Sequence, residues 1–195
     1  MFEFARLTDA GAAAALHALV FGEGERGVRA FYAPDAEREI HGVFDGDVLV
    51  SALSFFPVEV GGAACVYMAG VCTHPDYRGR GLFRRNFAQA KAATAYDARN
   101  LFCIPANDSL FGLYESVGLR KRTCASLVSL DGSGSGGGYA FDGDYERLYA
   151  LYLASGPDVR HPFPLFRACV DNFLAAGSAY YVQDGFALID GAGVR

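Results

Sequence analysis

Two glycines and four arginines lie close together in residues 71–85, which read VCTHPDYRGRGLFRR. Glycine lets backbone N–H groups approach a ligand closely, and the planar guanidinium group of arginine suits phosphate. An apolar run precedes this stretch and an alanine-rich segment follows it. A buried strand would therefore turn into the N-terminus of a helix, where a partial positive charge favours anions. The pattern predicts a local anion site, although an exposed arginine turn is the alternative for an isolated R-G-R-G.

Two common phosphate-binding motifs are excluded at this turn. A Walker loop requires G-x-x-x-x-G-K-[ST], which is absent, and a dinucleotide fingerprint requires a glycine where Arg84 stands. A second segment, NDSLFGLYESVGL at residues 107–119, predicts a helix that Asn107 or Asp108 caps and Gly118 ends. Tyr114 lies on this helix. By itself, a tyrosine on an amphipathic helix is expected to belong to the core.

Together the two segments resemble the GCN5-related N-acetyltransferases. Arg78 and Gly81 occupy the first and fourth positions of the acetyl-CoA signature R/Q-x-x-G-x-G/A. Asn107 and Tyr114 are seven residues apart, as in that family, within N-x6-L/Y-Y-E-x-x-G-F/L. The resemblance covers roughly residues 1–130. Within the family, the run LFCIPANDSLFGLYESVGL resembles the branch that includes the intracellular-survival acetyltransferases. Phe83 departs from the small residue that usually closes the signature.

The resemblance implies an enzyme in which a primary amine attacks the thioester of acetyl-CoA directly, within a ternary complex. Tyr114 would be the general acid that protonates the departing thiolate. The pantetheine arm and thioester would be bound by Val71, Cys72 and Thr73, and Asn107 would bind the pantetheine region or an ordered water. The residues expected at the pyrophosphate are Arg78, Gly79, Arg80, Gly81, Leu82, Phe83 and Arg84. A non-catalytic acyl-CoA-binding sensor or scaffold is the alternative.

The general base stays unassigned. Many relatives carry a glutamate on the strand before the pyrophosphate turn, but residues 63–71 contain no acidic residue. Glu59 and Asp108 are weak candidates, and a chain of water molecules is an equal alternative. Cys72 has no identifiable histidine partner, and direct transfer needs no nucleophilic cysteine.

The order of the expected strands and helices predicts a mixed α/β sheet. This is also the fold of the acetyltransferases that the motifs resemble. Strands that first pair as hairpins and then alternate with helices are typical of this class. The apolar run 63–71 predicts a strand buried on both faces. The expected strands are 2–6, 63–74, 100–106 and 119–130, together with two strands within 39–60 that form a hairpin with its turn at 45–47. The expected helices are 9–20, 25–33, 82–96 and 107–118, and Thr8 or Asp9 is expected to cap the first of them.

The rest of the chain predicts a linker and a C-terminal extension. Residues 1–130 form the expected acetyltransferase domain, residues 131–138 are rich in glycine and serine, and residues 139–195 form the extension. Helices are expected within 141–156 and 163–176, and strands at 178–183 and 185–189. We interpret the extension as part of a degenerate second lobe. Its many aromatic and leucine side chains predict that it packs on the first domain.

Composition and charge limit the function. The chain has 195 residues, 52% of them hydrophobic, and a net charge of −5. The negative charge argues against general nucleic-acid binding and favours a cationic amine as partner. Five cysteines without a C-x-x-C pair and four scattered histidines predict a reduced, cytoplasmic protein without a metal site. No signal peptide or membrane span is expected. The oligomeric state stays open, a homo-oligomer included.

Overall fold

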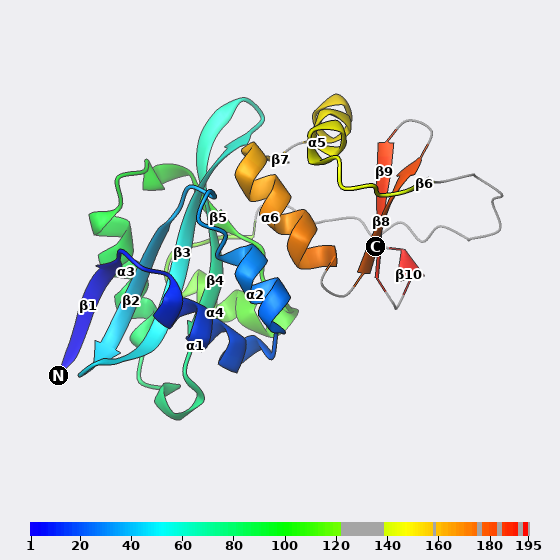
Figure 1. Cartoon of the computed structure of the whole chain (residues 1–195). Coiled ribbons are helices and arrows are strands. Elements are labelled where there is room, and N and C mark those ends of the chain that lie inside the picture. Colours follow the sequence, from blue (N-terminus) through cyan, green and yellow to red (C-terminus); the bar gives the residue numbers. More distant parts are fainter. Residues whose placement is uncertain (122–138, 158, 175–176, 183–184, 191–192, 195) are drawn as a thin grey trace.

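The computed structural model describes residues 1–121, 139–157, 159–174, 177–182, 185–190 and 193–194 (Figure 1). It contains a six-stranded sheet with helices on both faces, followed by a smaller four-stranded sheet. The expected linker at 131–138 lies outside the described residues, as does most of the strand expected at 119–130.

The first sheet has the strand order β1-β2-β3-β4-β5, with the short strand β7 also paired to β3. All pairings are antiparallel except that of β4 with β5, which is parallel. This is the mixed α/β architecture that the sequence predicts. The strands are β1 (Phe2–Leu7), β2 (Glu39–Asp45), β3 (Val48–Val60), β4 (Ala63–Thr73), β5 (Leu101–Cys103) and β7 (Val159–Arg160).

Helices cover the two faces of this sheet and bury separate clusters. On one face, α1 and α2 pack around Leu16, Val28 and Cys72. On the other face, α3 and α4 pack around Phe87 and Tyr114. The helical elements are α1 (Gly11–Phe21), α2 (Glu25–Phe31), η1 (Pro75–Tyr77), α3 (Leu82–Ala93), η2 (Ala98–Asn100), η3 (Asp108–Leu110) and α4 (Phe111–Glu115).

Two local predictions are wrong. The α1 N-cap is Ala10, and no described side chain caps it, so neither Thr8 nor Asp9 fills this role. Strand β4 is buried on alternate residues rather than on both faces: Val66 and Met68 are buried, whereas their neighbours are partly exposed. The half-buried residues Cys65, Tyr67 and Ala69 pack against the cluster of Phe56, Val58 and Leu165 without being fully covered.

A β-bulge interrupts β4 near its C-terminal end. Ala52 pairs with Cys72 and Ser54 pairs with Ala69, so β4 has one residue more than β3 in this interval. Gly70 lies in the bulge with φ of +60°, in the left-handed region that glycine adopts without a steric penalty. The bulge changes which face the following side chains occupy. Val71 packs with the α3/α4 cluster, whereas Cys72 lies in the α1/α2 cluster.

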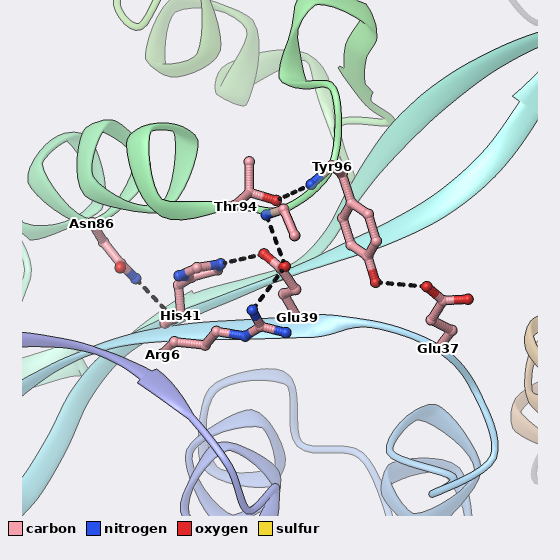
Figure 2. Close-up of polar contacts among 8 residues, drawn as sticks. Arg6, Glu37, Glu39, His41, Asn86, Thr94 and Tyr96 are labelled. Atoms are coloured by element: carbon pink, nitrogen blue, oxygen red, sulfur yellow. Dashed lines mark hydrogen bonds and ion pairs between the residues drawn. The ribbon is translucent and has the colours of Figure 1, made fainter.

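A buried polar network fixes the C-terminal end of α3 to the start of β2 (Figure 2). The Glu39 carboxylate is 1% exposed and lies 3.1 Å from both Arg6 Nη1 and His41 Nε2. It also accepts a hydrogen bond from the Ala95 N–H at 3.0 Å. Asn86 on α3 donates to the His41 carbonyl oxygen at 3.1 Å. Because these contacts satisfy the buried carboxylate, we assign the network a structural role.

The C-terminal segment packs on the first sheet through α6 and β7. Leu165 of α6 joins Phe56 and Val58 in one buried cluster, and β7 pairs with the end of β3. The opposite side of α6 presents Phe166 and Val170 to the second sheet, so α6 lies between the two sheets in Figure 1. The elements are β6 (Tyr139–Ala140), α5 (Tyr145–Ala154), α6 (Phe163–Leu174), β8 (Gly177–Val182), β9 (Gly185–Asp190) and β10 (Gly193–Val194), with sheet order β10-β9-β8-β6.

Candidate functional site

The turn between β4 and α3 has the conformation that its two glycines permit. Gly79 and Gly81 have φ values of +76° and +70°. A Cβ on either residue would meet no described atom within 4 Å, so these positions favour glycine for its backbone freedom and not for lack of space. The Tyr77 hydroxyl donates to the Asp45 carboxylate at 3.0 Å, and Arg78 Nε donates to the Thr73 carbonyl at 3.3 Å. These bonds tie the turn to the sheet.

Helix α3 begins directly at this turn with Gly81 as its N-cap, and no described side chain accepts from its first amides. The first backbone bond is from the Arg85 N–H to the Gly81 oxygen at 3.2 Å. The N–H groups of residues 82–84 are therefore available to a ligand, as expected at an uncapped helix start. Leu82 and Phe83 are buried and anchor this turn. Phe83 packs edge-on against Tyr114, so its departure from the family signature serves the core.

The arginines of the motif are exposed and lie in different directions. Arg80 lies over the Tyr77 ring, 4.7 Å from its centre, and donates to the Asp76 carbonyl at 3.0 Å. Arg84 Nε donates to Ser116 Oγ at 2.9 Å and so reaches the end of α4. The arginines therefore form no single cluster at the turn.

A groove of about 510 Å³ lies between α3 and the end of α4, next to Arg84. Two cations, Arg84 and Lys91, are two helical turns apart on its α3 side, and Ser116 lines the opposite side. Lys91 and Ser116, which line this groove, are not among the candidates that the sequence motifs indicate. The spacing of seven residues between Arg84 and Lys91 was the available signal, because it puts both side chains on one face of a helix. The lining residues are Arg84, Phe87, Ala88, Lys91, Ala92, Ser116 and Val117.

Strand β4 has an open edge beyond the point where β5 ends. The last parallel pair is Met68 with Cys103, whereas β4 continues to Thr73. In the described part of the chain, no strand pairs with this edge of β4 from residue 69 to 73. The carbonyl oxygens of Cys72 and Thr73 accept from Ser51 Oγ and Arg78 Nε. The other backbone groups on this edge can pair with an extended ligand, much as an edge strand accepts a peptide.

Cys72 contributes to this edge only through its backbone. Its thiol is 3% exposed, and burial raises its pKa to about 12. A thiol with this pKa stays protonated and is a poor nucleophile at neutral pH. Thr73 Oγ1 lies 3.0 Å from Ser51 Oγ across the β3–β4 pair, so this side chain is engaged within the sheet.

Tyr114 lies beside the end of β5, on the α3/α4 side of the sheet. Its side chain is 8% exposed, and its hydroxyl makes no hydrogen bond to any residue that the structure describes. Burial raises its pKa to about 12, and the neighbouring Cys103 thiol adds to this shift. The phenol is therefore protonated at neutral pH, and its proton is not committed to a protein acceptor.

The remaining sequence candidates are a helix cap, Asn107, and two acidic residues, one exposed and one half-buried. Asn107 caps η3, because its Oδ1 accepts from the Ser109 N–H at 3.1 Å. Asp108 is exposed. Glu59 lies 3.7 Å from Arg160 in the β3–β7 pair, and its cross-strand partner on β4 is Ala64, near the opposite end of that strand from Thr73. The structure therefore does not bring Glu59 to the open edge.

A family model agrees with this arrangement. Residues 3–120 match the model described as an acetyltransferase (GNAT) domain, which is more than half of the chain. The chain therefore belongs to the GNAT acetyltransferase family, whose members use acetyl-CoA. The narrower intracellular-survival-type branch stays a prediction. No curated protein matches the chain significantly.

Solved structures with the same fold are acetyltransferases. AAC(6')-Iy in complex with the bisubstrate analogue CoA-S-monomethyl-acetylneamine has a TM-score of 0.54 at 14% identity, over 67% of this chain and 99% of that chain. A putative acetyltransferase from Agrobacterium tumefaciens has a TM-score of 0.53 at 14% identity, over 66% of this chain and 99% of that chain. An acetyltransferase from Trypanosoma brucei has a TM-score of 0.51 at 18% identity, over 67% of this chain and 100% of that chain. Likenesses at these identities support the fold alone.

No group of three or more His, Cys, Asp or Glu side chains could hold a metal ion in the part of the chain that the structure describes. None of the described helices is both long and apolar enough to span a bilayer.

Proposed function

We propose that the protein transfers the acetyl group of acetyl-CoA to a primary amine, by direct attack within a ternary complex. One observation carries the proposal: the uncapped start of α3, at a turn with two left-handed glycines, lies at the end of the open edge of β4. The start of α3 would bind a diphosphate and the open edge of β4 would bind an extended arm that contains amide groups, so the two sites would adjoin each other. Coenzyme A contains both groups in this order.

The residues present fit this cosubstrate. The amides at 79–84 would bind the pyrophosphate, with Arg78, Arg80 and Arg84 around them. The backbone of Val71, Cys72 and Thr73 would pair with the pantetheine arm, and the Asn107 amide group, whose oxygen is used as a cap, would donate through its nitrogen. The bound thioester would supply the acetyl group. A backbone N–H at the β4 edge would stabilise the developing oxyanion, an effect of about 3 kcal/mol for one donor.

Tyr114 would protonate the departing thiolate. Its hydroxyl is protonated at neutral pH and donates to no described residue, as a general acid requires before the reaction. Its position beside Cys103, where β5 ends, supports a role next to the open edge of β4. The groove between α3 and α4 would take the adenosine end, with Arg84 and Lys91 facing the 3'-phosphate.

The experiment that tests the proposal separates binding from turnover. Calorimetry with coenzyme A measures binding, and release of free thiol from acetyl-CoA with neamine, spermidine and a lysine peptide measures transfer. We expect binding and amine-dependent thiol release. Binding without release for any amine would favour the sensor or scaffold alternative. No binding of coenzyme A would remove the site assignment.

A further inference from the structure

A second group of polar side chains lies on the α1/α2 side of β4, opposite Tyr114. It consists of His17 on α1, Glu23 in the α1–α2 connection and Tyr32 at the end of α2. His17 and Tyr32 are 3% and 8% exposed, yet both carry polar atoms into an otherwise apolar cluster. Burial of unpaired polar groups is costly, so their presence here requires an explanation.

The three side chains are arranged in a line. Glu23 Oε2 lies 3.3 Å from His17 Nε2, and the Tyr32 hydroxyl lies 3.4 Å from His17 Nδ1. His17 Nε2 and Glu23 Oε2 are fully buried and form no hydrogen bond of good geometry to any described residue. The Glu23 side chain is nevertheless 35% exposed, so its other atoms reach solvent. The imidazole thus lies between a buried interior position and a carboxylate that contacts water.

The interior end of this line adjoins the bulge of β4. A Cβ built on Gly70 would lie 3.7 Å from His17 Nδ1 and 2.9 Å from the Phe31 ring. Because Gly70 has no side chain, the Phe31 ring and His17 Nδ1 both lie close to the backbone of the bulge. Residues 69–73, the open edge, begin here. His17 and Tyr114 therefore approach the same part of β4 from opposite faces of the sheet.

The position of His17 is fixed by its neighbours. Its ring packs against Phe21 and Phe31, with ring centres 4.5 and 4.8 Å away. Arg38 donates to the Phe31 and Ala33 carbonyl oxygens at the end of α2. These contacts hold the end of α2, and with it Phe31 and Tyr32, against the imidazole. Such support is expected of a group that must keep one orientation.

We propose that His17 accepts the proton of the attacking amine at Nδ1, with Glu23 as the positioning residue that holds the opposite ring nitrogen. This inference rests on the proposed acetyl transfer and names the base that the sequence left unassigned. The acid would then act on the sulfur from the α3/α4 side and the base on the nitrogen from the α1/α2 side.

The proton balance of the step is complete with these groups. The ammonium gives one proton to His17 Nδ1, and the imidazolium passes its Nε2 proton to Glu23 and on to water. The nitrogen lone pair forms the C–N bond while the C–S bond breaks, and Tyr114 gives its proton to the thiolate. The amine nitrogen then loses its second proton, which reprotonates the Tyr114 phenolate oxygen. The products are the amide, the free thiol of coenzyme A and one proton in solution.

The charges around His17 leave it able to act as a base. Burial lowers its pKa below the ordinary value of 6.5, and Glu23 partly offsets this shift. Burial raises the pKa values of Tyr32 and Cys72, so both are neutral at physiological pH. The charged groups facing this cluster are Glu23 and Arg38. The imidazole is therefore uncharged at neutral pH, and the lone pair of Nδ1, which has the Tyr32 hydroxyl as a neighbour at 3.4 Å, can accept a proton.

The first test does not depend on the acceptor amine. Nitrogen-15 NMR of the histidine side chains, with and without acetyl-CoA, should show a change at His17 and none at His41, which lies in the Glu39 network. Glu23→Gln should lower the His17 pKa further, because it removes the group that raises it. If acetyl-CoA binds and the His17 signals stay unchanged, His17 is not at the reaction centre. If acetyl-CoA does not bind, the proposed function itself fails.

The second test uses the amine that supports turnover. His17→Gln should lower kcat by at least roughly 10²-fold and remove the acid limb of the pH profile. Glu23→Gln should shift that limb to lower pH, whereas Glu25→Gln, an exposed control on α2, should match the wild type. Affinity for coenzyme A should stay within twofold in all three variants. An unchanged kcat and an unchanged acid limb in His17→Gln would overturn the inference.

Discussion

Replacing Gly81 with alanine tests the turn that carries the proposed function. Gly81 has φ of +70°, and a Cβ there meets no described atom within 4 Å. Gly81→Ala therefore introduces backbone strain without a steric clash. The left-handed conformation costs an alanine about 1–2 kcal/mol. For a chain of this length, a loss of this size lowers Tm by about 2–4 °C for each kcal/mol.

The effect on binding follows from how the strain is relieved. If residue 81 leaves the left-handed region, the amides at the start of α3 no longer converge. A hydrogen bond to a charged group contributes about 1.5–3 kcal/mol, so loss of one such bond weakens coenzyme A binding by roughly 10- to 100-fold. Calorimetry measures this change, and thermal unfolding measures the strain.

Gly46 supplies the matched control. It lies in the β2–β3 turn with φ of +59°, and a Cβ there also meets no described atom within 4 Å. Gly46→Ala should lose similar stability and bind coenzyme A as the wild type does. If Gly81→Ala loses clearly less stability than Gly46→Ala, because residue 81 has left the left-handed region, and still binds coenzyme A with unchanged affinity, the amides of this turn do not bind the pyrophosphate.

Three further predictions address other parts of the molecule. Tyr114→Phe should lower kcat by roughly 10²-fold with unchanged coenzyme A affinity, and equal turnover would return Tyr114 to a purely structural role. Lys91→Ala should weaken binding of coenzyme A but not of 3'-dephospho-coenzyme A; an equal effect on both would contradict the groove assignment. Glu39→Gln should cost about 1–3 kcal/mol in unfolding experiments, because buried donors lose their acceptor, whereas Glu37→Gln should cost little.

The pH dependence of the Glu39 contribution has a defined sign. Burial alone would raise the Glu39 pKa, but hydrogen bonds from Ala95, Thr94 and His41 and the charge of Arg6 together lower it. Its stabilisation is therefore complete above the unfolded-state pKa of about 4.3 and is lost as the pH falls through the lower folded-state value. A Glu39→Gln protein should accordingly lose less stability on acidification than the wild type.

Local patterns in the sequence predict the elements of the fold well. The turn with Gly79 and Gly81, the hairpin turn at Gly46 and the helix that Asn107 caps are all set by residues that act on their own backbone. The α1 cap is the exception. Asp9 could fill this position by residue type, but the N-cap is Ala10, one residue later.

Contacts between distant segments could not be predicted from the sequence. The line of Glu23, His17 and Tyr32 depends on the α1–α2 connection, and its approach to Gly70 depends on a bulge that the apolar sequence of β4 does not reveal. The same bulge and the short β5 create the open edge. Residues 63–71 contain no acidic side chain, and the polar side chains of His17 and Tyr32 come to this strand from helices α1 and α2.

The central claim is tested most directly by mass spectrometry of amine products after incubation with acetyl-CoA. The protein should add one acetyl group to the nitrogen of at least one amine among neamine, spermidine and a lysine peptide. His17→Gln and Tyr114→Phe should each slow the reaction by roughly 10²-fold. A protein that binds coenzyme A but yields no acetylated amine, or whose two variants acetylate as fast as the wild type, would contradict the account.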